Sequence, residues 1–214
     1  TLKGRQYSIT NAINDAMNDA MNPKSHTISP YYLNAAIWGA QRKGFDTQHM
    51  LLASGLTPAA PALSLEEALR VPPEKVSKLI RTLWQTMDDE FMGFTKQPCR
   101  QGVFSIMAKQ AITCENLKEA LIHGAHFYHL IHPDIMFKFK VKGSEAHLSF
   151  ELVRPDLDPD HFLVEFFLLI WHRFSNWLVG QRVPLKYANF AYPSPIHVKE
   201  YSLLFPCHCR FKQQ

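Results

Sequence analysis

The hydrophobic residues in the first half of the chain recur at helical spacing. Ser29-Pro30 predicts a helix start, because serine caps a helix and proline fits its first turn, and this helix should run to about Lys43. Asp46 is expected to cap a second helix that ends at Ser54-Gly55. Further helices are predicted from Pro72-Pro73 to Met87, from Val103 to Ala111, and from Glu115, capped by Thr113, to about Ile131.

The spacing changes to strict alternation after residue 135. Apolar residues alternate with lysines over 136–142, and alternation returns over 148–152 after the turn signal Gly143-Ser144, which together predict a β-hairpin. A long helix should start at Asp158-Pro159 and run to about Val179, closed by Gly180. Two short strands are expected near 185–192 and 201–211. The predicted fold is α+β, with a helix-rich first half and a hairpin and small sheet packed with a long central helix in the second half.

The domain organisation follows from the same pattern. Residues 1–29 are polar and rich in asparagine, and we interpret them as an N-terminal tail. Residues 57–63 contain two prolines and are expected to form a connector. One domain should therefore occupy residues 30–214.

Composition indicates a folded protein of a reducing compartment. Apolar residues make up 46% of the chain and charged residues 20%, and the net charge is only +4, which is not typical of a nucleic-acid-binding protein. The longest apolar run, 162–171, spans ten residues, far fewer than the roughly 20 that cross a bilayer, so no membrane span is expected. Four cysteines lack a disulfide pattern, and the chain starts at Thr1 without an apolar signal, so we expect part of a cytoplasmic protein.

The long helix carries the residues that we expect to bind a small molecule. Apolar side chains cover most of its circumference, so it should be buried. Its polar residues form a narrow stripe. A rotation of 100° per residue places Glu165, His172 and Asn176 within about 40° of each other around the helix axis. A solvent-facing stripe is the alternative interpretation. The predicted ligand-binding residues are Glu165, His172, Arg173, Asn176 and Trp171.

A row of histidines supports an alternative function, a metal- or haem-dependent sensor or enzyme on the 123–132 helix. His123, His126, His129 and His132 are spaced three apart, and Cys207 and Cys209 could add soft ligands. Helical geometry turns the four rings progressively around the helix, and it places His126 and His129 on the solvent-facing side. Catalytic motifs are missing from the sequence, so we expect neither enzyme activity nor a cofactor.

The two helices around Gly44 could also form a DNA-binding helix-turn-helix. Residues 46–62 contain no lysine or arginine, however, and neutralisation of phosphates dominates DNA affinity. We therefore interpret the pair as a structural helical hairpin.

With these pieces in order, the chain resembles the N-terminal effector-binding domain of one branch of the AraC-type transcription regulators, often labelled arabinose-binding-like. The resemblance spans about residues 30–211 and rests on a series of landmarks: Leu51–Leu56, Arg70-Val71-Pro72, Asp88-Asp89, Met92-Gly93-Phe94, Gly102-Val103-Phe104, Thr113–Leu121, the hairpin, Trp177–Gly180, Phe190–Pro195 and Tyr201–Phe205. It implies a bacterial regulator domain that binds a small-molecule effector and forms a homodimer. It also implies that a helix-turn-helix pair beyond Gln214 contacts promoter DNA. The histidine-rich stretch 124–129 departs from the family pattern, so the effector's identity stays open.

Overall fold

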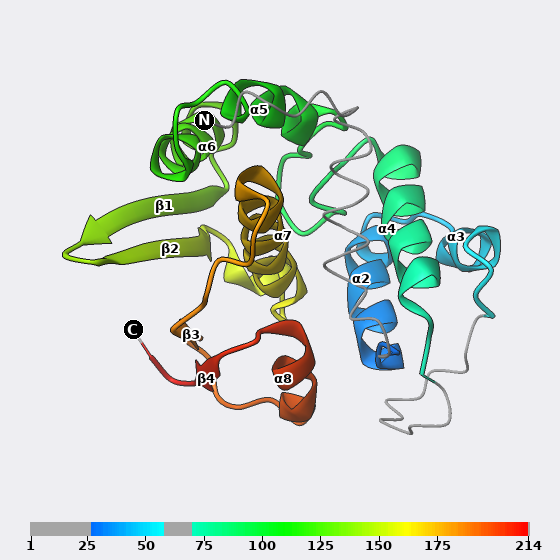
Figure 1. The fold of residues 1–214 in the computed structure, drawn as a ribbon. Coiled ribbons are helices and arrows are strands. Elements are labelled where there is room, and N and C mark those ends of the chain that lie inside the picture. The colour runs from blue at the N-terminus through cyan, green and yellow to red at the C-terminus, as the bar shows by residue number, and fades with distance from the viewer. Residues whose placement is uncertain (1–26, 58–69, 214) are drawn as a thin grey trace.

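The computed structural model describes residues 27–57 and 70–213 and places one long helix, α7 (Phe162–Val179), at the centre of an α+β fold (Figure 1). Helices α2 (Pro30–Arg42), α3 (Thr47–Ala53) and α4 (Pro73–Met87) lie on one side of α7, and α5 (Val103–Ala111) and α6 (Leu117–Ile131) lie at one end. The hairpin of β1 (Ile135–Lys142) and β2 (Glu145–Leu152) projects from the opposite side. A 3-10 helix, Pro155–Leu157, precedes α7. The elements after α7 are β3 (Tyr187–Asn189), the 3-10 helix Val198–Glu200, α8 (Tyr201–Leu204) and β4 (His208–Arg210).

Most predicted helices form within a residue or two of the expected bounds. Ser29 caps α2 by accepting from the Tyr31 amide, and Asp46 caps α3 by accepting from the His49 amide. The predicted cap of α6 is wrong, because Asn116 accepts from the Glu119 amide and the helix begins at Leu117. The Thr113 hydroxyl instead donates to the carbonyl of the preceding turn.

The predicted start of α7 is also wrong. The helix begins at Phe162, after His161, whose φ of 57° is left-handed and cannot continue an α-helix. Asp158 still acts on the helix start, because its carboxylate accepts from the amides of Leu163 and Val164, each at 3.2 Å. The side chain reaches these amides from a loop rather than from a cap position. Gly180 ends the helix with a φ of 71°, as expected.

The hairpin prediction is confirmed, and β2 packs on α7 through the stacked rings of Phe150 and Phe167, 3.8 Å apart. A second, parallel sheet joins β3 to β4. The strand predicted over 201–211 is wrong at its start, since 201–204 form α8. Tyr201 and Phe205 are both buried, and their spacing of four residues puts both side chains on one face of a helical turn.

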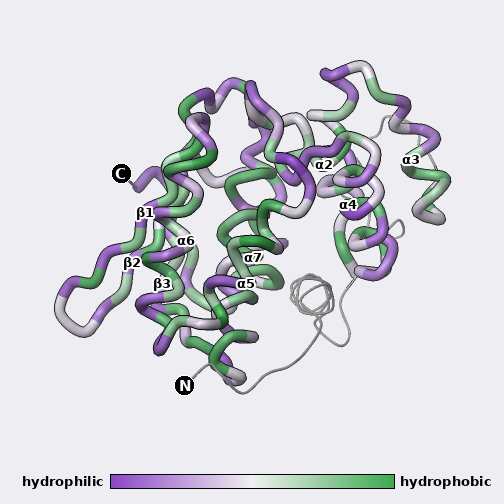
Figure 2. The backbone as a smooth tube through the Cα atoms, turned by 90° about the horizontal axis from the view of Figure 1, so that it is seen from above, coloured by the Kyte–Doolittle hydropathy of each residue, from purple (hydrophilic) through white to green (hydrophobic). Residues whose placement is uncertain are grey.

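Close packing against α7 requires glycine on the neighbouring helix. Figure 2 shows hydrophobic residues along α7, and Trp171 is 1% exposed within that region. A Cβ built on Gly124 of α6 would lie 2.1 Å from Cη2 of Trp171. The indole ring therefore fills the space that any larger residue at position 124 would need.

Helix α7 is the only helix among residues 27–57 and 70–213 with the length and composition of a membrane span. Core helices of soluble folds meet the same criterion, and 61% of this helix is buried within the protein. Its packing against the surrounding elements identifies it as the core helix of this fold.

The first described residues, Thr27 and Ile28, lie just before α2. Ile28 is buried and pairs with Val71 in an isolated antiparallel bridge, so the end of the predicted tail 1–29 contacts the domain. Residues 1–26 and most of the predicted connector 57–63 lie outside the described residues.

Candidate functional site

Three tyrosines surround the carboxylate of Glu165 on α7. Tyr192 donates to Oε1 at 2.7 Å, Tyr201 donates to the same oxygen, and Tyr32 donates to Oε2 at 3.4 Å. The hydroxyls of Tyr192 and Tyr201 are themselves 3.0 Å apart. Glu165 is only 3% exposed, and these contacts are what makes its burial possible. We call these four residues the Glu165 cluster.

The Glu165 cluster joins segments from both halves of the chain. Tyr32 lies on α2, Tyr192 follows β3, and Tyr201 begins α8. The sequence predicted Glu165 as a ligand-binding residue but missed its partners. Their signal was present in the landmarks Phe190–Pro195 and Tyr201–Phe205, because tyrosines within apolar stretches bury their rings and keep a polar tip that needs a partner.

A small cavity borders the Glu165 cluster. It has a volume of about 30 Å³, enough for one or two water molecules. Apart from Tyr32 and Glu165, its walls are apolar. The lining residues are Ile28, Tyr32, Val76, Phe162, Glu165, Phe166, Leu169 and Leu204. We call it the Glu165 cavity.

Burial changes the acid–base properties of this site. It raises the pKa of Glu165 to about 7, although the hydrogen bonds from Tyr201 and Tyr192 act in the opposite direction. Burial, followed by the charge of Glu165, raises the pKa of both these tyrosines, so they remain neutral donors. The carboxyl group can therefore exist in either form near neutral pH, and a ligand that offers a donor or a positive charge would favour the carboxylate.

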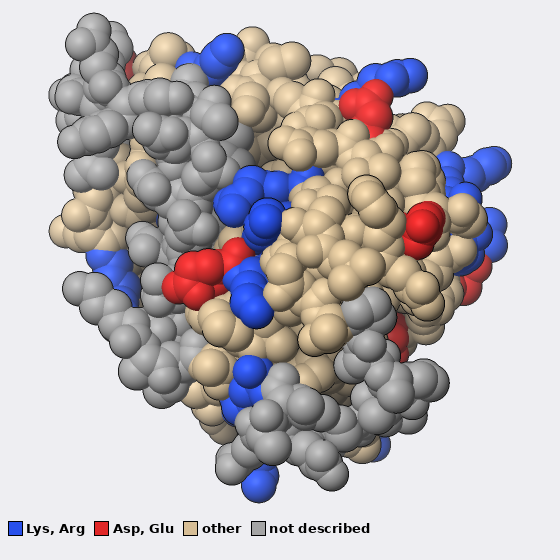
Figure 3. Space-filling model, turned by 90° about the vertical axis from the view of Figure 1, so that its right-hand side faces the viewer, with Lys and Arg blue, Asp and Glu red and all other residues tan. Residues whose placement is uncertain are grey.

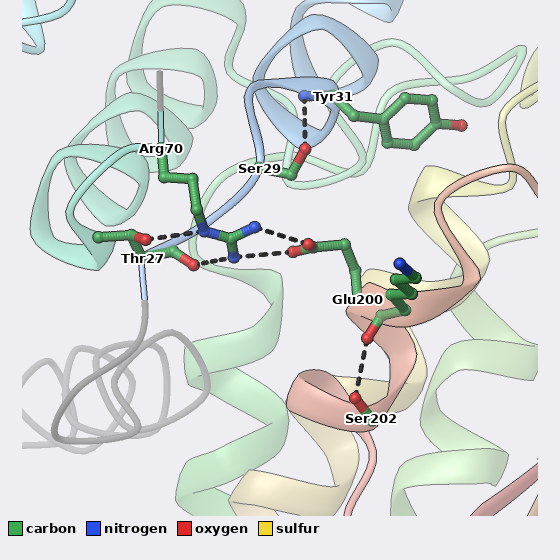
Figure 4. Close-up of polar contacts among 7 residues, drawn as sticks. Thr27, Ser29, Tyr31, Arg70, Glu200 and Ser202 are labelled. Atoms are coloured by element: carbon green, nitrogen blue, oxygen red, sulfur yellow. Dashed lines mark hydrogen bonds and ion pairs between the residues drawn. The ribbon is translucent and has the colours of Figure 1, made fainter. Parts of the chain in front are cut away.

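An ion pair involves Glu200, the residue before Tyr201 of the cluster. Nη1 of Arg70 donates to Oε1 of Glu200 at 2.7 Å, and Nη2 donates to Oε2 at 3.1 Å (Figure 4). The same guanidinium donates through Nε to Oγ1 of Thr27 at 2.8 Å. This arrangement ties the segment before α4 to the 3-10 helix before α8 (Figure 4).

Two histidines stack on tyrosines next to the cluster. The ring of His197 lies 3.8 Å from that of Tyr31, and the ring of His161 lies 3.8 Å from that of Tyr192. His197 is 3% exposed, and neither of its ring nitrogens has a hydrogen-bond partner among the described residues. Burial lowers the pKa of both histidines.

The other predicted ligand-binding residues do not gather around Glu165. His172 and Asn176 both bind the backbone of Val183. The Nε2 atom of His172 lies 2.9 Å from the Val183 carbonyl oxygen, and Oδ1 of Asn176 accepts from the Val183 amide at 2.7 Å. They hold the segment that follows α7. Arg173 is half-buried beside them. Glu165 and Asn176 lie on the same face of α7, but eleven residues separate them by about 16 Å along the helix axis, so they do not form one site.

Trp171 lines a different cavity, which also has a volume of about 30 Å³. The two cavities share only Phe166 among their lining residues.

The histidine row does not form a cluster. His126 and His129 are exposed, as the helical geometry predicted, whereas the Nε2 atom of His132 lies 3.0 Å from the Gln97 carbonyl oxygen. In the part of the chain that the structure describes, no three His, Cys, Asp or Glu residues are placed to hold a metal ion. The half-buried thiols of Cys207 and Cys209 are free.

Two buried acidic residues, Asp89 and Glu90, have a structural role that the sequence did not predict. The Asp89 carboxylate accepts from the amides of Phe91, Gly93 and Cys99, at 2.8 to 2.9 Å. Glu90 accepts from the amides of residues 102 and 104, at 2.7 and 2.9 Å. These bonds shape the loop between α4 and α5, which accounts physically for the acidic and glycine landmarks of this region.

The charges on the face that carries α3 do not favour direct contact with DNA. Basic and acidic side chains are interspersed on the face toward which α3 and α4 lie (Figure 3). Helix α3 itself carries no lysine or arginine. Binding to DNA through this helix therefore lacks the positive surface that phosphate contacts need.

The family model for the arabinose-binding N-terminal domain of AraC transcription regulators matches residues 44–214, well over half of the chain. The chain belongs to this family. It is thus a ligand-binding domain of a transcription regulator, a family of sensors rather than of known enzymes. The matched region includes α7, Tyr192 and Tyr201, whereas Tyr32 lies before it. No curated protein matches the chain.

Proposed function

We propose that this domain senses a small-molecule effector in the Glu165 cavity and that it is not an enzyme. The observation that carries this proposal is a buried carboxyl group, held by three tyrosines, at the edge of an apolar cavity. Ligand pockets combine apolar walls with a few convergent polar groups in the same way. Membership of a family of ligand-binding regulator domains supports this assignment.

The size of the cavity bears on the mechanism. A space of about 30 Å³ excludes any metabolite larger than a few atoms, so binding must open the region. A ligand with a hydroxyl or amine donor could replace one tyrosine at Glu165 without leaving the carboxylate unsatisfied. Effector binding would then select a conformation in which Tyr192 or Tyr201 has moved.

Movement of these tyrosines would reach the C-terminal end of the domain. The ring of Tyr201 lies 5.2 Å from that of Phe211, and the ring of Phe190 lies 5.4 Å from the same residue. We propose that a helix-turn-helix pair follows residue 214 and contacts promoter DNA, and that the effector changes how this pair is presented. Residues 30–214 would also mediate homodimerisation, in a cytoplasmic bacterial regulator.

Ligand-induced thermal stabilisation tests the sensor role. A panel of metabolites should contain a compound that raises the melting temperature of the chain in proportion to its concentration, because a ligand that binds only the native state stabilises it. Tyr192→Phe should weaken this response, since it removes one donor to Glu165. Tyr187→Phe on β3 makes the same chemical change outside the Glu165 cluster and should leave the response intact. An effector response that is equal in both variants would place the pocket elsewhere.

A further inference from the structure

The second cavity is enclosed mainly by aromatic rings. It lies between α4, the loop that follows α4, α5, α6 and α7, and its volume is about 30 Å³. The lining residues are Trp84, Glu90, Phe91, Phe104, Tyr128, Leu163, Phe166, Phe167, Ile170 and Trp171. We call it the indole cavity.

Two of the lining residues carry a buried indole N–H group for which the described residues provide no acceptor. They are Trp84 of α4 and Trp171 of α7, and neither Nε1 atom has a hydrogen-bond partner among the described residues. Trp171 as a whole is 1% exposed. An indole nitrogen can only donate, so each group needs an acceptor that residues 27–57 and 70–213 do not supply. Buried polar groups in native proteins are rarely left in this state.

The other polar groups of the cavity are already used or neutral. Both carboxylate oxygens of Glu90 accept backbone amides, and burial raises the pKa of this residue to about 7. Burial also raises the pKa of Tyr128, which keeps its phenol neutral. An anionic ligand would be desolvated next to Glu90 and would face its negative charge, so the surroundings favour an uncharged molecule.

We propose that the indole cavity is a second binding site, which takes a compact, uncharged and largely apolar compound whose carbonyl oxygen accepts from the indole N–H groups of Trp84 and Trp171. Flat aromatic or short aliphatic carbonyl compounds match the ring-lined walls. Because the cavity shares only Phe166 with the Glu165 cavity, this site is distinct from the proposed effector pocket.

The two tryptophans have different parts in this proposal. The six-membered ring of Trp171 fills the space at Gly124, so this indole is fixed. Trp84 is partly exposed and packs edge-on against Phe166, with ring centres 6.3 Å apart. A ligand larger than one or two water molecules needs more room than about 30 Å³, and displacement of Trp84 would provide it.

A pair of matched probes tests this site by NMR. Acetophenone carries a carbonyl oxygen, whereas ethylbenzene has a similar shape without it. In protein with ¹⁵N-labelled tryptophan, acetophenone should shift the indole signals of Trp84 and Trp171 downfield in a saturable manner. The indole signals of Trp38 and Trp177, which do not line the cavity, should stay in place and act as internal controls. Ethylbenzene should cause no downfield shift.

Single substitutions assign the signals and test the hydrogen bonds. Trp84→Phe and Trp171→Phe each remove one N–H group, and each should weaken acetophenone binding about five-fold, which corresponds to one neutral hydrogen bond of about 1 kcal/mol. If Trp171→Phe does not fold, Trp84→Phe at the partly exposed position still provides the test. Tyr192→Phe should not change acetophenone binding, which separates this site from the proposed effector pocket.

Three results would overturn the proposal. Equal shifts with acetophenone and ethylbenzene would show that no hydrogen bond is made. An absence of saturable shifts up to the solubility limit of acetophenone would show that the cavity does not open. Indole signals of Trp84 and Trp171 that exchange with water and ignore both probes would show a hydrated cavity and no ligand site.

Discussion

The buried carboxyl group of Glu165 should make the free energy of unfolding depend on pH, and the Glu165→Gln substitution tests the sign of this dependence. Its pKa in the folded protein is raised from 4.5 to about 7, mainly by burial. The native state therefore binds more protons than the unfolded state between these values, and the wild-type free energy of unfolding should fall as pH rises through this range. A difference of this size corresponds to roughly 3 kcal/mol. Glu165→Gln keeps the shape of the neutral acid and cannot ionise.

We expect the stability of Glu165→Gln relative to wild type to increase by roughly 3 kcal/mol from pH 4.5 to pH 8. The amide remains able to bind the tyrosines, because it accepts through oxygen and can donate through nitrogen to the hydroxyl of Tyr32. Urea unfolding, followed by tryptophan fluorescence at several pH values, gives both free energies. Glu151→Gln on the exposed side of β2 is the matched control and should not reproduce the trend.

The reasoning also predicts a second effect at this site. Tyr192→Phe removes a donor that stabilises the carboxylate, so it should raise the midpoint of the pH transition further. If the difference in free energy of unfolding between Glu165→Gln and wild type is constant over the pH range, burial does not raise the pKa of Glu165 and the reasoning is refuted. A difference that decreases with pH would show that the hydrogen bonds outweigh burial.

Three further predictions concern packing, the ion pair and histidine. Gly124→Ala should lower the free energy of unfolding by about 1–3 kcal/mol despite the better helix propensity of alanine, and Trp171→Phe should reduce this loss; stabilisation in a urea titration would contradict the packing. A double-mutant cycle of Arg70→Ala and Glu200→Ala should give a coupling of about 1 kcal/mol that weakens in high salt, whereas zero coupling at low salt would count against the ion pair. Burial lowers the pKa of His197, so the stability that the neutral imidazole contributes is complete above pH 6.5 and is lost as pH falls. The free energy of unfolding of His197→Phe should therefore depend less on pH in acid than that of wild type, by at most about 1.4 kcal/mol per pH unit. Thermal unfolding at several pH values measures this, and a steeper pH dependence in the variant would contradict the prediction.

Local signals in the sequence were sufficient to predict most of the fold. Caps such as Ser29 and Asp46, the terminal Gly180 and the alternation of residues 136–142 act within a few residues of their own position. One error arose because a side chain acts over a longer reach. Asp158 binds amides five and six residues ahead from a loop, which moves the helix start to Phe162.

The candidate site could be predicted only in part, because it depends on tertiary contacts. Helical periodicity identified Glu165 as a polar residue on a buried helix, but it could not identify Tyr32, which is 133 residues away in the chain. Periodicity also grouped His172 and Asn176 with Glu165, although their partner is the backbone of Val183. An angular position on a helix carries no information about position along its axis, and none about which segment packs there.

Binding of an effector at Glu165 is the central claim, and titration calorimetry with a compound that stabilises the chain tests it most directly. Wild type and Tyr187→Phe should bind this compound with the same affinity, and Tyr192→Phe should bind it at least about five-fold more weakly, as expected for the loss of one hydrogen bond. Equal affinities in all three proteins would contradict the claim. Failure of every compound in the metabolite panel to bind the chain would contradict it as well.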